Sequence, residues 1–418
     1  MKPSGIEWIG DIPDDWEVRK LLSLFKEHKD RNKNLREQNL LSLSYGKIKR
    51  KDINNNDGLL PASFETYNIV ENGDIVFRLT DLQNDKRSLR TGIVTQRGII
   101  TSAYVTIRPK IKLDSRFYHY LYHMYDICKV FYGMGDGVRQ GMGFEELKNI
   151  PTLIPPLKTQ QKIADYLDEK CGEIDATIAK QKESIEKLKA YKQSLISETV
   201  TKGLDKSAPL KPSGIEWIGN IPYDWEIRKV KNTGKLIGGS GFPEEYQGVK
   251  DEKIPFIKVK SLAEDPISRN GKDSISESIR SKLNAEKFIK GSVVFAKVGA
   301  ALLLQRFRIL EFDSCIDNNM MGFIPLVIEP RFFKYVTILF DFSYFVNPGT
   351  VPSINQEQIG NIKIPFPPLK SQEKIADYLD GKCSQIDKYI TEKQNIIQKL
   401  DAYKKSLIFE CVTGKKRI

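Results

Sequence analysis

Apolar residues recur with heptad spacing in two long stretches of the chain, 158–202 and 370–418. A stripe with this spacing is typical of a helix that packs along another helix. No proline interrupts either stretch, and Thr159 and Ser371 stand where helix N-caps are expected. About 40 residues at ~1.5 Å each form a rod of roughly 60 Å. We therefore predict two long helices that pack on each other. Their predicted seam positions are Leu167, Ile174, Ile178, Ile185, Leu188, Leu195, Leu379, Ile386, Ile390, Ile397, Leu400 and Leu407.

Polar residues interrupt the predicted seam at four positions, Gln181, Lys192, Lys393 and Lys404. Such residues cost stability and tend to fix the register of a helix pair. Spacing alone permits parallel or antiparallel pairing. We predict the antiparallel arrangement, which relates the two halves of the chain by a pseudo-twofold axis, and we interpret the helices as a spacer of defined length.

The regions outside the helices have the pattern of short strands. Residues 66–108 and 254–328 contain runs of β-branched and aromatic residues bounded by Gly, Asn and Asp, which is typical of strands and hairpins. A helix is predicted after each set, over 117–132 and 331–346. The predicted fold class is therefore α+β, with two mixed α/β globular domains separated by two long, antiparallel coiled-coil helices.

Two segments of the chain occur twice, in the same order. Lys2–Lys20 is repeated at Lys211–Lys229, and Ile154–Asp175 is repeated at Phe366–Asp387. The inserts between these matched flanks, 21–153 and 230–365, show no comparable match. With only two long copies, the pattern indicates a duplicated unit and excludes a solenoid. The predicted division of the chain is 1–157 (first domain), 158–202 (first spacer helix), 203–369 (second domain) and 370–418 (second spacer helix).

Composition narrows the class of protein. The chain has 418 residues, of which 40% are hydrophobic and 29% charged, as in an ordinary soluble protein. No run approaches the ~18 apolar residues of a membrane span. Its five cysteines fall at no metal-ligand spacing and are odd in number, so we expect reduced thiols and a cytoplasmic location. The net charge of +12 is spread along the chain and is compatible with a phosphate-backbone partner.

Motifs for catalysis are missing from the sequence. It has no G-x-x-x-x-G-K-[ST] loop for ATP and no Asn-Pro-Pro-aromatic or Asp-Pro-Pro-Tyr motif for adenine methylation. The Gly-rich segment 133–143 lacks the spacing of a dinucleotide loop. His119 and His123 are four residues apart, but no third ligand follows, so we interpret them as packing residues. We predict a non-catalytic chain with no metal site.

The flanks and one internal strand resemble a known family. IPDDWEVRKL (12–21) and IPYDWEIRKV (221–230) resemble the opening of target-recognition domains in type I restriction-modification specificity subunits. ENGDIVFRL (71–79) and IKGSVVFAKV (289–298) resemble an internal strand of those domains. GMGFEELKNIPTLIPPLKTQQKIADYLD and PSINQEQIGNIKIPFPPLKSQEKIADYLD resemble their exit segment into the spacer helix. The resemblance covers nearly the whole chain.

That resemblance implies a subunit that recognises double-stranded DNA, with each domain reading one half of an asymmetric bipartite site. The spacer helices would set the gap between the half-sites and dock two methyltransferase subunits, and translocase-nuclease subunits would join for restriction. Adenine-N6 methylation and cleavage would be done by these partners with S-adenosylmethionine, ATP and Mg²⁺, none of them bound by this chain.

Basic and amide side chains in the inserts are the candidates for DNA contacts, since such residues pair with phosphates and base edges. A solvated surface charge is the alternative for each. The candidates are Lys47, Lys49, Arg50, Lys86, Arg87, Arg90, Arg139, Gln140, Lys258, Lys260, Lys297, Arg306 and Arg308. Two other functions stay open from sequence. One is a stand-alone coiled-coil DNA-binding structural or regulatory protein, and the other is an enzyme whose site has no recognisable motif.

Overall fold

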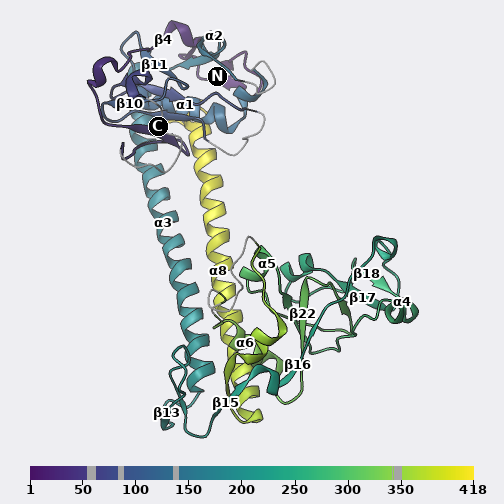
Figure 1. Ribbon diagram of the computed structural model, residues 1–418. Coiled ribbons are helices and arrows are strands. Elements are labelled where there is room, and N and C mark those ends of the chain that lie inside the picture. Colours follow the sequence, from purple (N-terminus) through teal and green to yellow (C-terminus); the bar gives the residue numbers. More distant parts are fainter. Residues whose placement is uncertain (54–62, 83–88, 135–140, 341, 343–350) are drawn as a thin grey trace. The chain divides into compact units, whose positions relative to one another are not determined.

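A computed structural model describes residues 1–53, 63–82, 89–134, 141–340, 342 and 351–418 (Figure 1). By its internal contacts the chain divides into two units. Unit 1 comprises Met1–Glu183 and Lys393–Ile418, and unit 2 comprises Ser184–Glu392. Each unit therefore contains one globular region together with parts of both long helices.

The main sheet of unit 1 has four antiparallel strands in the order β4-β11-β8-β9. Helix α1 (Ser115–Ile127) covers it, with Tyr118 against Phe25 and Tyr122 against Phe77 at ring-centroid distances of 5.2 and 5.5 Å. All four rings are fully buried. The strands are β4 (Phe25–Glu27), β11 (Val105–Pro109), β8 (Ile75–Phe77) and β9 (Thr91–Ile93).

The described residues of unit 1 also form four two-stranded antiparallel ladders. In one of them, β3 pairs with β12, so the strand that leads into the first insert lies beside the strand that leaves it. The matched flanks of the sequence are thereby joined into one frame. The ladders are β1 (Lys2–Pro3) with β2 (Asp11–Ile12), β3 (Glu17–Lys20) with β12 (Pro151–Ile154), β5 (Leu41–Ser44) with β6 (Lys47–Arg50), and β7 (Asn68–Val70) with β10 (Gly98–Ile100). A short helix, α2 (Phe144–Leu147), precedes β12.

Unit 2 has the same frame around a different insert. Its main sheet follows the order β16-β22-β19-β20, and β15 pairs with β23 as β3 does with β12. It differs in having a three-stranded sheet, β18-β17-β21, in which β17 and β21 are parallel. The strands are β13 (Leu210–Pro212), β14 (Asn220–Pro222), β15 (Glu226–Lys229), β16 (Gly234–Gly238), β17 (Ile254–Ile257), β18 (Asp273–Ile275), β19 (Val293–Ala296), β20 (Arg308–Ile309), β21 (Cys315–Ile316), β22 (Met320–Pro325) and β23 (Lys363–Phe366).

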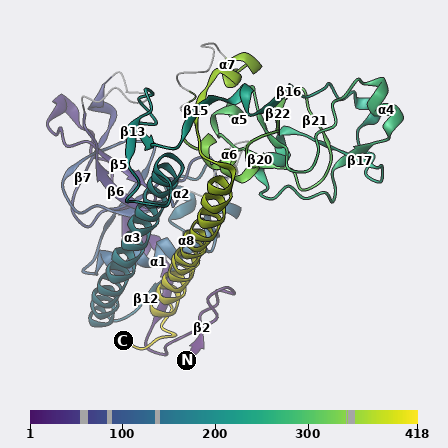
Figure 2. The same cartoon turned by 90° about the horizontal axis from the view of Figure 1, so that it is seen from below.

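The three-stranded sheet of unit 2 packs around its own small core, in which Phe242 stacks on Phe256 with ring centroids 4.0 Å apart. In both views β17 and α4 lie at the end of this unit away from α8, whereas α6 lies next to α8 (Figure 1, Figure 2). The helices are α4 (Glu277–Lys282), α5 (Ala300–Leu303), α6 (Pro330–Thr337) and α7 (Gln356–Asn361).

The two long helices are present, as predicted from the heptads. Helix α3 spans Leu157–Lys202 and α8 spans Leu369–Val412. The predicted N-caps are wrong, because Thr159 and Ser371 lie inside the first turn and donate their backbone N–H groups to the carbonyls of Pro156 and Pro368. Of the described helices, none is long and apolar enough to cross a membrane.

Inside unit 1, the first part of α3 and the last part of α8 run in opposite directions. Lys404 Nζ lies 2.6 Å from Asp175 Oδ1, and Lys393 Nζ lies 3.1 Å from Gln181 Oε1. Three of the predicted polar seam residues, Gln181, Lys393 and Lys404, thus form hydrogen bonds across the pair. Of the twelve predicted apolar seam positions, seven are buried and five half-buried. The half-buried ones are Leu188, Leu195, Ile390, Ile397 and Leu400.

The mixed α and β content agrees with the predicted fold class. The two shorter predicted helices are present, but their predicted ends are wrong. Helix α1 ends at Ile127, short of residue 132, and α6 ends at Thr337, after which Ile338 and Leu339 form tighter turns. Most of the remaining predicted stretch to 346 lies outside the described residues. The division at 157, 202 and 369 stays a prediction.

Candidate nucleic-acid interface

Strands β5 and β6 form a hairpin that lies on strand β9 of unit 1. Leu43 and its cross-strand neighbour Ile48 face Gly92, where an added Cβ would lie 2.6 Å from Leu43 Cδ1 and 3.1 Å from Ile48 Cδ1. Any larger residue at position 92 would require the ends of these two side chains to shift. Because side chains alternate along a strand, the opposite face of the hairpin is directed outward. That outer hairpin face consists of Ser42, Ser44, Lys47 and Lys49.

Three predicted DNA contacts belong to this hairpin. Lys47, Lys49 and Arg50 are all exposed. Lys47 Nζ lies 3.4 Å from Asp175 Oδ2 of α3, a long pair that still leaves 68% of the lysine side chain exposed. Burial would raise the pKa of Asp175, but hydrogen bonds from Lys404 and Lys47 outweigh it, so this pKa is lowered. The Asp175 carboxylate therefore pairs with two lysines, Lys404 of α8 and Lys47 of the hairpin.

Arg90 was a predicted DNA contact and is instead a structural residue. Its side chain is fully buried. The guanidinium donates to the carbonyls of Arg78, Thr80 and Asp81 and to the Tyr132 hydroxyl, at 2.8–3.2 Å. These bonds hold the backbone after β8 next to Arg90, which directly precedes β9. Because the guanidinium is buried and bonded in this way, it is out of reach of a DNA surface.

Four further candidates, Lys86, Arg87, Arg139 and Gln140, lie outside the described residues. Their predicted role stays a prediction.

In unit 2, two candidates are held by neighbouring protein groups. Lys258 Nζ lies 2.7 Å from both Asp273 Oδ2 and Gln247 Oε1, and 4.9 Å from the centre of the Phe242 ring. Arg308 is 15% exposed and donates to the carbonyl of Glu264 at 2.7 Å. Burial lowers its pKa, although Asp265 opposes this effect. Both side chains are fixed by the fold.

The other unit 2 candidates are available for a ligand. Lys260 is exposed, and Lys297 and Arg306 are half-buried. None of the three forms an ion pair with another described residue. The charge of these three candidates is therefore not balanced by an ion pair within the described part of unit 2.

Each globular region is joined to its helix by the same set of bonds. In unit 1, Arg116 pairs with Asp165 and Asp168 of α3 at 2.8 and 2.9 Å. In unit 2, Arg331 pairs with Asp377 and Asp380 of α8 at 2.7 and 2.9 Å. Hydrogen bonds to acidic side chains raise the pKa of both arginines, chiefly through Asp114 for Arg116 and Glu329 for Arg331.

Two tyrosines and two glutamines complete these junctions. The hydroxyl of Tyr120 donates to Asp168 at 2.8 Å, and that of Tyr335 donates to Asp380 at 2.7 Å. Gln160 accepts from the backbone N–H of Asp114 and donates to the carbonyl of Pro155. Gln372 makes the corresponding bonds to Glu329 and Pro367. Sequence reasoning missed this role, although the signal was present in the repeated Q-x-K-I-A-D-Y-L-D.

His119 and His123 lie one turn apart on α1, with ring centroids 6.0 Å apart, and His123 lies beside the hairpin turn. An added Cβ at Gly46 would be 3.5 Å from His123 Cε1. Burial lowers the pKa of His119 to about 3, with a contribution from His123, and lowers that of His123 to about 4. Within the described part of the chain, no group of three or more His, Cys, Asp or Glu side chains is placed to hold a metal ion.

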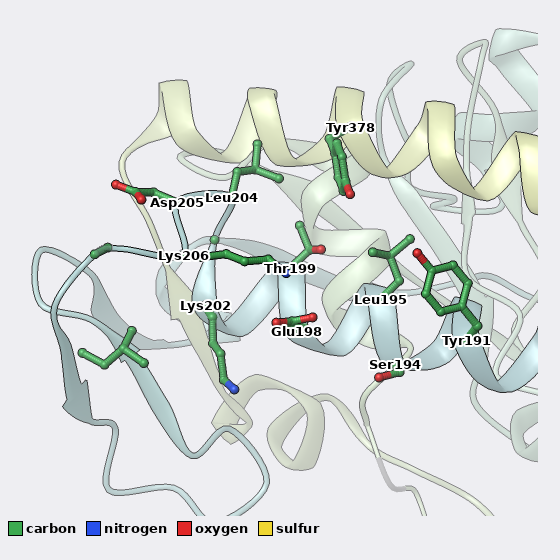
Figure 3. A pocket seen from close by; sticks show the side chains of 13 residues that line it. Tyr191, Ser194, Leu195, Glu198, Thr199, Lys202, Leu204, Asp205, Lys206 and Tyr378 are labelled. Carbon is green, nitrogen blue, oxygen red and sulfur yellow. The ribbon is translucent and has the colours of Figure 1, made fainter.

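A pocket of about 580 Å³ lies at the end of α3 in unit 2 (Figure 3). Tyr378 of α8 is directed toward it, opposite Leu195 and Thr199 of α3. Its acidic and basic lining groups balance, since Glu198 and Asp205 accompany Lys202 and Lys206. The pocket therefore carries no excess of positive or negative charge that would favour a ligand of the opposite sign.

Comparison with known proteins shows two copies of one domain. The family model described as "Type I restriction modification DNA specificity domain" matches residues 13–189 and again 222–402. The putative type I restriction enzyme MjaX specificity subunit of Methanocaldococcus jannaschii is 24% identical over 431 residues, with 98% of this chain and 96% of that protein covered.

Solved structures agree on the fold. A chain from a study of complex assembly and conformational transition of the type I R-M system superposes with a TM-score of 0.72 at 14% identity, covering 97% of this chain and 100% of that one. The HsdS subunit from Thermoanaerobacter tengcongensis gives 0.53 at 15% identity, covering 97% and 98%. On the family match, this chain belongs to the type I restriction-modification DNA specificity family and carries two copies of its domain.

Proposed function

We propose that this chain is the DNA-binding specificity subunit of a type I restriction-modification complex, and that it recognises an asymmetric bipartite site. One observation carries the proposal. Two units share the same strand frame and the same helix junctions, yet present different surfaces from their inserts. Identical inserts would suit a palindrome, whereas different inserts suit two unlike half-sites.

Each unit supplies cations from its own insert for its half-site. Unit 1 offers the exposed Lys47, Lys49 and Arg50 of its hairpin, and unit 2 offers Lys260, Lys297 and Arg306. Lysine and arginine position a protein on phosphates, and arginine also pairs with guanine edges. The unit 1 set lies on a hairpin, whereas the unit 2 residues lie on a 3-10 helix and in loops, so we expect the two half-sites to differ.

The long helices act as the spacer between the half-sites, as an antiparallel coiled coil with pseudo-twofold symmetry. Support comes from the Asp175–Lys404 bond of unit 1 and the Lys192–Asp387 bond of unit 2, which join corresponding positions of the two repeats. The five half-buried seam residues leave apolar surface that a third and fourth helix can cover. We assign this surface to two methyltransferase subunits.

Catalysis belongs to the partner subunits in this proposal. The methyltransferase subunits transfer a methyl group from S-adenosylmethionine to adenine N6, and translocase-nuclease subunits use ATP and Mg²⁺ for restriction. This chain binds none of these cofactors and works in the cytoplasm, where its substrate DNA and its partners are located.

Co-expression with the cognate methyltransferase tests the function. Genomic DNA from cells that hold both proteins is sequenced for N6-methyladenine, and cells that lack either protein are the controls. We expect methylation at one bipartite motif only when both are present, and no methylation or cleavage by the purified chain with any cofactor. Methyl transfer or cleavage by the chain alone contradicts the proposal. Tight DNA binding as a homodimer, with no effect on methylation, supports the stand-alone alternative.

A further inference from the structure

The turn of the β5–β6 hairpin carries an aromatic residue in an unfavourable backbone conformation. Ser44 and Lys47 are cross-strand partners, so Tyr45 and Gly46 form a two-residue turn. Their φ angles are +47° and +76°, as a type I′ turn requires. Asn-Gly is the favoured sequence for this turn, and a bulky side chain at positive φ is disfavoured. Tyr45 therefore occupies a position where asparagine would fold better.

The ring of Tyr45 is mostly exposed to solvent. Its side chain is 78% exposed, more than any other large apolar or aromatic residue of the described chain. Residues held in sparsely populated backbone conformations cluster at active sites and ligand-binding sites. An exposed ring at a strained turn thus indicates a partner that contacts it.

The charge around the turn identifies the class of that partner. The segment 47–51 reads Lys-Ile-Lys-Arg-Lys, and all four of its basic residues are exposed. Ser42 and Ser44 add hydroxyls to the outer hairpin face, directly opposite Lys49 and Lys47. Serine and lysine donors beside an aromatic ring suit a polyanion with flat apolar groups, which is the chemistry of DNA.

The support beneath the hairpin keeps this face fixed. Leu43 and Ile48 close over Gly92, and the turn rests on Leu89 and His123 through Gly46. The pair between Lys47 and Asp175 ties the end of the hairpin to α3. A two-stranded ribbon fits the major groove of B-DNA, which is about 12 Å wide. Ribbons that pack on the protein with one face contact bases with the other.

We propose that the outer hairpin face lies in the major groove of the half-site recognised by unit 1, with Tyr45 at its tip against the base edges. Lys47 and Lys49 contact phosphates, and Ser42 and Ser44 contact phosphates or base edges. This inference rests on the proposed function and adds the residue that makes the apolar contact in one half-site.

The test uses the complex of this chain with its cognate methyltransferase and a labelled duplex carrying the methylated motif. Tyr45→Asn removes the ring and places the favoured residue in the turn, so the fold is maintained or stabilised. We expect the dissociation constant for this duplex to rise about tenfold, as for one lost base contact of ~1.4 kcal/mol. A duplex altered only in the unit 1 half-site should show a much smaller change.

Three variants sharpen the result. Tyr45→Phe keeps the ring and should bind like the original chain. Tyr223→Asn removes a ring that is 69% exposed in unit 2 and should leave binding unchanged. Lys49→Ala should lower the slope of log affinity against log salt concentration by about one.

The outcomes separate the inference from the proposed function. If the unaltered complex shows no preference for a bipartite duplex, the proposed function itself is wrong. If it does, and Tyr45→Asn binds equally well, the inference about the hairpin is wrong. The inference is also overturned if Tyr45→Asn lowers methyltransferase binding while DNA affinity stays the same, because the ring would then contact protein.

Discussion

Units 1 and 2 differ most clearly at one position of the main sheet. Gly92 of β9 lies opposite Val76, and Arg308 of β20 lies opposite Val294, so the two residues occupy corresponding places. At Gly92 the hairpin residues Leu43 and Ile48 pack against the strand, whereas the side chain of Arg308 donates a hydrogen bond to the carbonyl of Glu264. The side chain at this place of the sheet thus has a different neighbour in each unit.

The two units are alike where each globular region joins its long helix. Arg116 and Arg331 each form ion pairs with two aspartates of a long helix. The side chains of Gln160 and Gln372 each donate a hydrogen bond to the carbonyl of a preceding proline. In each unit the arginine belongs to the insert and the aspartates belong to the long helix. Two inserts that show no comparable sequence match thus keep the same bonds to their helices, while the rest of each insert differs.

The largest effect on stability and DNA recognition is expected from a larger side chain at Gly92, where the hairpin packs on β9. Gly92→Val places side-chain atoms where the ends of Leu43 and Ile48 now lie, so these side chains and the hairpin that carries them must shift. We expect the free energy of unfolding to fall by about 1–3 kcal/mol, with loss of recognition at one half-site. Urea unfolding and methylation sequencing measure the two effects.

The matched control for this variant is Gly172→Ala in α3, where an added Cβ meets nothing within 4 Å. A helical glycine replaced by alanine should raise the free energy of unfolding by up to about 1 kcal/mol. Equal behaviour of the two glycine variants contradicts the packing described for Gly92.

The next effect concerns the helices that both units share. Four residues are inserted after Ala179 and four more after Thr391, the corresponding position of the second repeat. Coiled coils tolerate this insertion as a stutter. Each insertion adds about 6 Å of helix, and one base pair rises about 3.4 Å, so the preferred gap should grow by one or two base pairs. Methylation of libraries with randomised gap length measures it, and an unchanged gap with normal activity shows that the helices do not set the spacing.

The smallest effect concerns Asp175, which pairs with both Lys404 and Lys47. Its pKa is lowered in the folded state, so its contribution to stability is present above the unfolded pKa of about 3.9. That contribution is lost as pH falls through the folded pKa. The carboxylate is 38% exposed, so solvent screening limits the contribution to at most about 1 kcal/mol.

Urea unfolding at pH 7 and pH 3 measures this effect. Asp175→Asn should be less stable than the original chain at pH 7, and the difference should shrink at pH 3. A difference that is the same at both values of pH excludes the ion pairs as its source. Asp387→Asn, which removes the carboxylate paired with Lys192 in unit 2, is the corresponding variant.

The helices were predictable from sequence because their determinants are local. The spacing of apolar residues in a heptad stripe identifies which face of the helix is buried. All twelve predicted seam residues, from Leu167 to Leu407, are at least half-buried. The N-caps were missed because proline carbonyls and the glutamine side chains, rather than Thr159 and Ser371, complete the first turn.

The candidate interface was only partly predictable, because charge in a sequence does not reveal burial. Arg90 and Lys49 look alike as insert cations, yet Arg90 bonds to three carbonyls and a tyrosine brought together by the fold. Lys258 likewise meets Asp273 only after β17 and β18 pair. Tyr45 was missed because its positive φ depends on the register of the hairpin, which sequence spacing did not define.

The central claim is that each unit recognises its own half of a bipartite site. Replacing residues 21–153 with the insert of another member of the family tests it directly, with N6-methyladenine sequencing of cells that also hold the cognate methyltransferase. The account predicts that one half of the methylated motif changes, while the other half and the gap remain as before. A motif in which both halves change together would contradict it.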